Sequence, residues 1–325
     1  MKAARFLGNK SIELYQAEKP VPDEGEVLLQ VGFCGLCGSD KRPYQEGFPL
    51  IPGHEVSGIV VDANGTGIPL NTRAAAYLSV YCGECEYCKR GLTNNCIHRK
   101  GLLGWSDPWN GGYAECMAVP ARDILVLDDS VTLEEGVLLL DTIGTSWHAL
   151  RMANVQSSSN VLIIGCGPLG LGAVAGAIAF GAANVYACDL VDYRRQAAAD
   201  LGAVAVTPQE MAQLEAIDVI VEAAGTPVTL MQAIRMVAPQ GRVVMLGEIW
   251  KPWTFEPDAD TMLKDYSLIR SWYFPIEEFA ENQQYVIDKK IDTAKLISHT
   301  MPLDDLQAAF QLFFSGQTRK VLSAS

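Results

Sequence analysis

Four cysteines in one short segment are the strongest sign of chemistry in this chain. They stand at Cys82, Cys85, Cys88 and Cys96, with two, two and seven residues between them. Four thiolates at this spacing can close a tetrahedral zinc site that has no open position. An iron–sulfur cluster is an alternative, whereas a disulfide scaffold is typical of short secreted chains. We therefore expect segment 82–96 to hold a structural zinc ion.

A second group of metal-binding residue types lies nearer the N-terminus. Cys37 and Ser39 stand in a turn flanked by glycines, which is suited to presenting a thiolate and a hydroxyl into a cleft. His54 and Glu55 come just before a predicted strand at 58–61. A thiolate with an imidazole suits zinc. A buried structural histidine is the alternative for His54.

A glycine-rich turn follows a short apolar run at 161–164. It contains Gly165, Gly167, Pro168, Leu169 and Gly170, and it leads into an apolar helix predicted over 171–180. A second apolar run then ends in Asp189. This order predicts a dinucleotide-binding βαβ unit, in which the first glycine allows a tight turn, the second a close approach to pyrophosphate, and the third close packing of helix on strand. The helix N-terminus supplies amide donors. A chance glycine turn in an unrelated α/β protein is the alternative.

The surrounding pattern predicts two kinds of architecture. The first 130 residues have strand-like alternation and many glycine turns, with little helical periodicity. A helix is predicted over 141–152, and apolar runs at 161–164, 184–188, 217–221 and 241–246 then alternate with helical stretches. That alternation indicates a parallel sheet with right-handed crossovers. The predicted fold class is α/β, with a doubly wound parallel sheet and a β-rich domain.

Length and charge exclude several classes of protein. The 325 residues allow two ordinary domains, and a net charge of −13 argues against general binding to nucleic acid or to an anionic membrane. The most apolar stretch, 161–183, carries six glycines and a proline, so no membrane span is expected. The first residues lack the pattern of a secretory signal, which predicts a cytoplasmic protein.

Taken together, the motifs resemble one known family over essentially the whole chain. Gly-His-Glu at 53–55, Cys-Gly-Ser-Asp at 37–40, the four-cysteine segment, Asn110 to Glu115 and the glycine turn resemble the zinc-dependent medium-chain alcohol and polyol dehydrogenases. The resemblance implies a GroES-like catalytic domain made of residues 1–140 and 271–325, with an inserted NAD-binding Rossmann domain at 141–270. A cleft would separate them, and the chain would form a homodimer or homotetramer.

The resemblance also assigns two ligands of a catalytic zinc ion, so that each chain would hold two zinc ions. Cys37 and His54 match the first two ligands of the family. Asp141 stands where relatives have a cysteine or a glutamate, and a carboxylate there would make the zinc a harder Lewis acid. Glu55 is the alternative third ligand, either directly or in exchange with water. The alternative role of Asp141 is an N-cap of the following helix.

Other positions are assigned to proton transfer and to the substrate cleft. Ser39 matches the hydroxyl that takes the substrate proton in relatives. Arg42 replaces a histidine that ends this relay in many of them, and a guanidinium cannot accept a proton. Thr145 resembles a residue beside the nicotinamide. Trp105 and Trp109 lie in a segment that lines one cleft wall in relatives, with packing over the cysteine segment as the alternative.

The cofactor is expected to be NAD rather than NADP. Asp189 would accept hydrogen bonds from the adenosine ribose, and its charge would repel a 2′-phosphate. Arg194 lies close enough in sequence to weaken that preference, because an arginine can accommodate the phosphate. Gly225 and Gly247 stand in predicted strand-end turns that would flank the bound cofactor.

The function expected is a zinc-dependent oxidoreductase that transfers a hydride between NAD and a small secondary alcohol, polyol or sugar-like substrate. An alcohol dehydrogenase for a bulkier biosynthetic intermediate is one alternative. A family member that binds NAD without catalysis is another. The joint presence of Ser39, Cys37 and His54 favours an enzyme.

Overall fold

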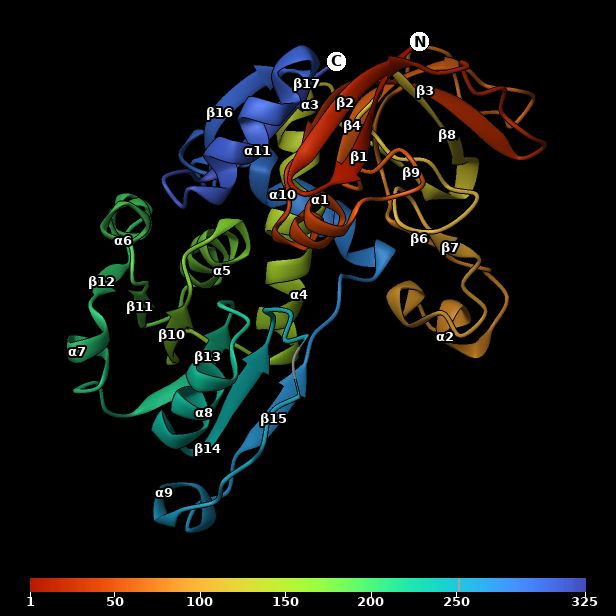
Figure 1. Ribbon diagram of the computed structural model, residues 1–325. Coiled ribbons are helices and arrows are strands. Elements are labelled where there is room, and N and C mark those ends of the chain that lie inside the picture. The colour runs from red at the N-terminus through yellow and green to blue at the C-terminus, as the bar shows by residue number, and fades with distance from the viewer. Residues whose placement is uncertain (251) are drawn as a thin grey trace.

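Two large sheets dominate the computed structural model, which describes residues 1–250 and 252–325 (Figure 1). One sheet combines N-terminal and C-terminal strands, and the other is built from the middle of the chain. The catalytic domain expected over 1–140 and 271–325 and the inserted domain expected over 141–270 stay a prediction. No helix of the described residues is long and apolar enough to cross a membrane.

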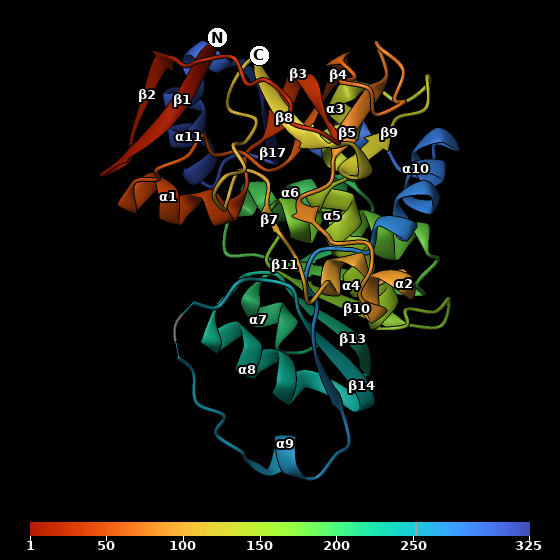
Figure 2. The same ribbon diagram turned by 90° about the vertical axis from the view of Figure 1, so that its right-hand side faces the viewer.

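The first sheet has seven strands and is closed by the C-terminus of the chain. Its order is β16-β17-β3-β4-β5-β9, with β8 also paired to β3. In β17, Leu322 lies opposite Gly35 of β3, so residues almost 300 positions apart become neighbours (Figure 2). The strands are β3 (Glu26–Gly35), β4 (Val56–Asp62), β5 (Arg73–Ala76), β8 (Cys116–Pro120), β9 (Ile124–Val126), β16 (Ile297–Pro302) and β17 (Lys320–Ala324).

Smaller elements surround this sheet. Two hairpin-like pairs are β1 (Lys2–Gly8) with β2 (Ser11–Gln16), and β6 (Ser79–Val80) with β7 (Gly101–Leu102). The helices are α1 (Lys41–Glu46), α2 (Glu86–Lys89), α3 (Leu133–Leu138), α10 (Phe279–Ile287) and α11 (Leu306–Phe314). The strand-rich character predicted for the first 130 residues is confirmed.

The second sheet is fully parallel, in the order β12-β11-β10-β13-β14-β15. This order is that of a doubly wound dinucleotide-binding sheet, in which the strand order reverses between β10 and β13. The strands are β10 (Asn160–Ile164), β11 (Asn184–Cys188), β12 (Val204–Val206), β13 (Ile217–Glu222), β14 (Val237–Met245) and β15 (Ser267–Arg270). The helices are α4 (Ser146–Met152), α5 (Pro168–Ala179), α6 (Asp192–Asp200), α7 (Pro208–Met211), α8 (Pro227–Met236) and α9 (Ala259–Met262).

Both faces of this sheet are buried, which explains why its strands read as continuous apolar runs. In β10, Val161 and Ile163 pack into the core on the side of α4 and α5. Leu162 and Ile164 point the other way, into the core below α8. Side chains alternate because successive residues of a strand face opposite sides of the sheet.

The helix after the glycine turn begins earlier than its apolar pattern predicts. It starts at Pro168 rather than at residue 171, because proline suits the first helical position, where no backbone donor is needed. Gly165 has φ +95°, and a Cβ on Gly170 would lie 1.8 Å from the Gly165 carbonyl oxygen. Both positions therefore require glycine, as the motif predicts.

The four-cysteine segment is tied to the chain as it leaves the second sheet. The amide group of Asn94 donates to the carbonyl of Trp272 (2.9 Å), and the Thr93 hydroxyl accepts from Ile276 N–H (2.9 Å). The guanidinium of Arg99 stacks 4.2 Å from the centre of the Trp272 ring. Residues 93–99 thus hold the connecting segment 272–276 in place.

Candidate active site

Four predicted ligand residues from three distant segments converge at one point. Cys37 follows β3, His54 and Glu55 precede β4, and Asp141 begins a wide helical turn before α4. Their ligand atoms all lie within 4.8 Å of one another. The structure therefore brings together the residues that the sequence assigned to a catalytic zinc, and thiolate, imidazole and carboxylate are its usual ligands.

Asp141 faces both other candidate ligands. Its Oδ2 lies 3.5 Å from His54 Nε2 and 3.7 Å from Cys37 Sγ. Burial opposes its ionisation, yet the contacts with His54 outweigh burial and lower the pKa of Asp141. The alternative N-cap role is wrong, because the cap position is Leu140 and Asp141 lies inside the helical turn. The predicted helix over 141–152 accordingly has a π-type first turn at Asp141–Thr145.

Glu55 is paired differently. It is fully buried and forms an ion pair with the buried ammonium of Lys320 on β17. Gly35 makes room for this pair, since a Cβ there would lie 2.7 Å from Lys320 Cε. Burial raises the pKa of Glu55 to about 7 against the attraction of Lys320. Lys320 was not singled out from the sequence, because 265 residues separate it from its partner.

Ser39 and Thr145 are the hydroxyls beside this cluster. The Ser39 Oγ is buried and has no hydrogen-bond partner among the described residues, so its own turn does not satisfy this hydroxyl. A buried hydroxyl of this kind calls for a partner. Thr145 donates to Asp141 Oδ1 (3.1 Å) and so orients the carboxylate, which is a role the sequence did not indicate.

Two further residues contact His54 without having been predicted to do so. The indole N–H of Trp105 donates to His54 Nδ1 (2.9 Å), and Asp40 Oδ1 lies 3.6 Å from the same nitrogen. Asp40 is buried, and its Oδ2 accepts from Cys37 N–H (3.1 Å) and from the Tyr113 hydroxyl (2.8 Å). Asp40 therefore ties the Cys37 turn to the histidine. Its place in Cys-Gly-Ser-Asp was the only available signal.

The turn that carries Asp141 is fixed against the helix of the glycine motif. A Cβ on Gly172 of α5 would lie 1.7 Å from the Thr142 carbonyl oxygen, so only glycine allows this approach. Ser146 Oγ donates to the Leu169 carbonyl (2.7 Å), and Trp147 Nε1 donates to the Gly172 carbonyl (3.0 Å). The candidate metal ligand and the dinucleotide turn thus share one rigid packing unit.

The four cysteines of segment 82–96, called the lobe from here on, have the arrangement of a tetrahedral metal site. The Sγ distances from Cys82 to Cys88 and from Cys85 to Cys96 are 3.9 Å, and those from Cys85 to Cys88 and from Cys82 to Cys96 are 3.5 Å. A zinc ion with Zn–S bonds of about 2.3 Å sets sulfur atoms about 3.8 Å apart, whereas a disulfide needs about 2.05 Å. Backbone hydrogen bonding from Cys88 lowers the pKa of Cys85 to about 6, whereas burial raises the pKa of Cys88 to about 12. The donor set fits zinc.

The glycine turn leaves space for a dinucleotide. A Cβ built on Gly167 would meet no atom within 4 Å, at the N-terminus of the twelve-residue α5. In the loop after β13, Ala224 N would lie 2.6 Å from a Cβ on Gly165, and Gly225 has φ +69° and packs on Gly247 and Glu248. Open space at a helix N-terminus suits an anionic pyrophosphate.

Asp189 lies at the end of β11, next to this turn. Its carboxylate accepts from the backbone N–H groups of Cys166 (2.8 Å) and Val191 (2.9 Å), and Arg194 Nη1 lies 3.9 Å from it. The carboxylate is thereby held at the edge of the glycine turn. Arg194 therefore lies beside the Asp189 carboxylate, as their closeness in the sequence predicts.

Arg42 lies apart from the cluster, on the exposed face of α1. It forms an ion pair with Glu46 (2.9 Å) and stacks 5.9 Å from the centre of the Trp250 ring. Arg42 therefore lies at the surface, and none of its contacts with the described residues replaces the missing histidine of the relay.

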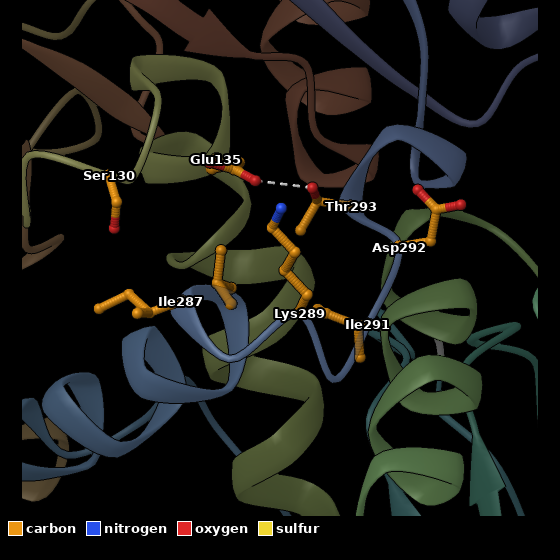
Figure 3. A pocket seen from close by; sticks show the side chains of 8 residues that line it. Ser130, Glu135, Ile287, Lys289, Ile291, Asp292 and Thr293 are labelled. Atoms are coloured by element: carbon orange, nitrogen blue, oxygen red, sulfur yellow. Dashed lines mark hydrogen bonds between the residues drawn. The ribbon is translucent and has the colours of Figure 1, made fainter.

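A cavity of about 340 Å³ lies elsewhere, between α3 and the segment after α10 (Figure 3). Glu135 and Lys289 point toward it, and Glu135 accepts from the Thr293 hydroxyl (2.8 Å). None of the candidate metal ligands lines it. The chemistry of this chain is therefore centred on the Cys37 cluster rather than on this cavity.

A strand-rich domain, a doubly wound parallel sheet with a glycine turn, and a cluster of candidate metal ligands after β3 together fit a metal-assisted, dinucleotide-linked oxidoreductase. Family models match both parts of the chain: "Alcohol dehydrogenase GroES-like domain" over residues 23–129 and "Zinc-binding dehydrogenase" over residues 168–287. The chain belongs to the zinc-binding alcohol dehydrogenase family. The predicted family, fold class and enzyme class, a zinc-type alcohol or polyol dehydrogenase, are confirmed.

Relatives cover nearly the full length. The chain is 30% identical to the uncharacterized zinc-type alcohol dehydrogenase-like protein YphC of Escherichia coli (strain K12), covering 99% of this chain and 98% of that protein. It is 29% identical to sorbitol dehydrogenase of Bacillus subtilis (strain 168), covering 99% and 96%. A solved alcohol dehydrogenase (rspB) of E. coli CFT073, complexed with NADH, superimposes with a TM-score of 0.90 at 25% identity, covering 100% and 99%.

Proposed function

We propose that this protein oxidises a small secondary alcohol, polyol or sugar-like substrate, or reduces the matching ketone, with zinc and NAD. One observation carries the proposal. The Ser39 hydroxyl, buried and without a partner, belongs to the same turn as Cys37, whose thiol meets His54 and Asp141. A protein that only binds a dinucleotide has no use for this combination, which disfavours the non-catalytic alternative.

Asp141 is the third catalytic zinc ligand in this proposal, with Cys37 and His54. Its Oδ2 already faces both of them, whereas Glu55 is engaged by Lys320. Thr145 supports the assignment by holding Oδ1 through a hydrogen bond, which leaves Oδ2 for the metal. Glu55 remains a neighbour that could exchange onto the metal only by leaving Lys320. Cys82, Cys85, Cys88 and Cys96 hold the second, structural ion.

Each residue then has a defined task. A zinc ion in this cluster would act as a Lewis acid on the substrate oxygen, and NAD would take up the hydride. Ser39 accepts the substrate hydroxyl proton at its Oγ and passes its own proton onward. Since Arg42 is engaged with Glu46 at the surface, the proton leaves through water. Asp40 holds His54 and the Cys37 turn, and Thr145 orients Asp141.

NAD is favoured over NADP by Asp189. Its carboxylate is fixed where the second strand of the βαβ unit ends, and it would accept from ribose hydroxyls and repel a 2′-phosphate. Arg194, 3.9 Å away, is the residue that could soften this preference. Gly165, Gly167, Pro168, Leu169 and Gly170 would hold the pyrophosphate, with Thr145, Gly225 and Gly247 towards the nicotinamide. The NADH complex of the E. coli relative supports this choice.

The substrate class rests on the ligand set and on relatives. A carboxylate in place of a third thiolate makes a harder metal site, which suits oxygen-rich substrates. The sorbitol dehydrogenase relative is consistent with a polyol. A bulkier biosynthetic alcohol is the second candidate, since the tryptophans of 105–109 could pack against it.

The test combines metal analysis with a substrate panel. Purified protein is expected to hold two zinc ions and to reduce NAD with polyols or secondary alcohols, but NADP far more slowly. Asp141→Asn is expected to remove one zinc ion, whereas Glu55→Gln in the same assay keeps both. Loss of zinc in Glu55→Gln alone would reverse the ligand assignment.

Ser39→Ala is expected to lower kcat about 100-fold with both zinc ions retained. No turnover by zinc-loaded, NAD-bound protein would overturn the proposed activity.

The assembly is proposed to be a homodimer or homotetramer in the cytoplasm. β15 is the outer strand of the parallel sheet, and exposed Met262 and Leu263 lie beside it in the chain. An outer strand invites pairing with a second copy. The nine free cysteines suit a reducing compartment. Light scattering that gives a monomer mass would overturn the oligomer.

A further inference from the structure

Glu222 is a buried carboxylate at the carboxyl end of β13, outside both metal-ligand clusters. Its Oε1 accepts from the backbone N–H groups of Ala224 (3.0 Å) and Gly225 (3.0 Å) and from the Thr229 hydroxyl (2.8 Å). The other oxygen, Oε2, is buried and has no hydrogen-bond partner among the described residues. One carboxylate oxygen therefore holds the loop that leads from β13 into α8.

The backbone of Glu222 holds a second loop. Its carbonyl oxygen accepts from the N–H groups of Leu246 (2.9 Å) and Gly247 (2.8 Å), which follow β14. The two loops are in close contact, because a Cβ on Gly247 would lie 2.4 Å from Gly225 N. Residue 222 thus fixes both loops and places them against each other.

The first of these loops also packs on the glycine turn, where Ala224 leaves no room for a Cβ on Gly165. The turn 165–170 follows β10, and the loop 223–226 follows the adjoining strand β13. The strand order of the parallel sheet reverses between these two strands, and ligands of such sheets bind in the crevice at the reversal. Any movement of loop 223–226 therefore changes one side of that crevice.

The carboxylate selects the shape of this loop. Gly225 has φ +69°, and glycine adopts positive and negative φ about equally, so its own backbone does not favour this conformation. The two hydrogen bonds to Glu222 supply the preference, because they tie successive N–H groups to one atom. Hydrogen bonds from backbone amides to an ionised carboxylate are stronger than those to a neutral oxygen. Loss of the charge would therefore loosen the loop even if an acceptor remained.

Resting on the proposed function, we propose that Glu222 is a positioning residue for the nicotinamide half of NAD. It acts through the loops of Gly225 and Gly247, which it holds in the shape that flanks the nicotinamide, rather than by touching cofactor or substrate. The adenosine half, assigned to the glycine turn and Asp189, does not depend on it. A substitution of Glu222 should therefore weaken the binding of NADH but not of AMP, which lacks the nicotinamide half.

The first test measures binding and needs no turnover. Full-length, zinc-loaded protein is titrated with NADH, followed by its fluorescence, and with AMP, followed by calorimetry. Glu222→Gln keeps the size of the side chain and an acceptor but removes the charge. We expect its Kd for NADH to rise about tenfold and its Kd for AMP to change less than about twofold. Equal weakening of both ligands, or unchanged binding of NADH, would overturn the proposal.

A second variant leaves the carboxylate in place. Thr229→Val removes one of the three donors to Glu222 Oε1. We expect its Kd for NADH to rise about threefold, again without an effect on AMP. This variant carries the test if Glu222→Gln does not fold, and an unchanged Kd for NADH would then overturn the proposal.

The matched control is Asp218→Asn. Asp218 lies on the same strand, and its carboxylate also accepts a backbone N–H, that of Asn160 (2.8 Å), but at the opposite end of the sheet. It should leave both Kd values unchanged. A rise for NADH as large as in Glu222→Gln would show that any lost carboxylate contact of β13 suffices, which would overturn the specific role of Glu222. In steady-state kinetics, Glu222→Gln should raise KM for NAD and leave KM for the alcohol unchanged.

These results separate the two proposals. If the parent protein binds NADH but turns over no alcohol, or binds neither NADH nor AMP, the proposed function fails whatever Glu222 does. If the parent oxidises an alcohol and Glu222→Gln binds NADH as tightly as the parent, the function stands and the positioning role falls.

Discussion

The two metal-ligand clusters of this protein are built in opposite ways. The lobe takes all four ligands from fifteen consecutive residues, uses one residue type, and leaves no open position. The Cys37 cluster collects a thiol, an imidazole and carboxylates from three segments, and it is surrounded by unsatisfied or exchangeable polar groups. A site made locally can serve stability alone. A site assembled across the fold depends on the whole structure and has the variety of ligands that chemistry needs.

The largest effect should come from Cys37→Ser. This substitution removes a ligand from the assembled cluster only, so we expect zinc content to fall from two ions to one and kcat/KM to fall at least 1,000-fold. The thermal midpoint should change little. Metal analysis, kinetics and calorimetry on one preparation check the three statements. Retained activity with one zinc ion would show that the assembled cluster is not catalytic.

Cys88→Ser should have the reverse profile. The closed lobe would lose its ion, and because binding energy of a structural zinc is folding energy, the protein should lose several kcal/mol of stability, with a thermal midpoint lower by on the order of 10 °C. The surviving folded fraction should keep its catalytic zinc. An unchanged midpoint after loss of one zinc ion would remove the distinction between the two clusters.

Lys320→Met tests the buried charge beside the assembled cluster. It leaves the Glu55 carboxylate without its cation, and we expect a loss of roughly 3–5 kcal/mol of unfolding free energy. Lys320→Met with Glu55→Gln should recover most of that loss, because no buried charge remains. Denaturant unfolding of the parent, both single variants and the double variant measures the coupling. Additive losses would contradict it.

The smallest effect concerns Asp123, near the base of the lobe. Its carboxylate is fully buried with neither oxygen hydrogen-bonded among the described residues, and burial raises its pKa to about 8. Between about pH 4 and pH 8 the folded state holds a proton that the unfolded state releases, so stability falls as pH rises through this window.

Asp123→Asn removes the buried carboxylate and with it this loss of stability at high pH. We expect the variant to be more stable than the parent at pH 9, by a few kcal/mol at most, and nearly equal to it at pH 4. Thermal melts at the two pH values, with the exposed Asp129→Asn as a control, measure the difference. A constant difference across pH would contradict the role of the Asp123 charge.

Sequence reasoning succeeded where the signal is local. The lobe and the turn at 165–170 are short motifs whose spacing sets their geometry, and both have the arrangement they predict. The first turn of the 141–152 helix and the start of α5 at Pro168 differ in detail, because neighbouring packing and proline chemistry decide them.

It failed where partners meet only through tertiary structure. Lys320 reaches Glu55 because β17 returns to pair with β3, which no residue near either position indicates. Trp105 was associated with a cleft wall, but its contact with His54 depends on a loop conformation without a motif. Asp40 had a motif but no visible role until Tyr113 and His54 were placed beside it.

The clasp between residues 93–99 and the connecting segment 272–276 also limits how the molecule can move. Two chain segments connect the parallel sheet covalently to the rest of the protein. One enters the sheet through α4, and the other leaves it after β15. Thr93, Asn94 and Arg99 hold the leaving segment just beyond Arg270. Any rotation of the parallel sheet therefore has to bend the chain before residue 272. The four-cysteine lobe would thus stay in place while the chain just before residue 272 bends as a hinge.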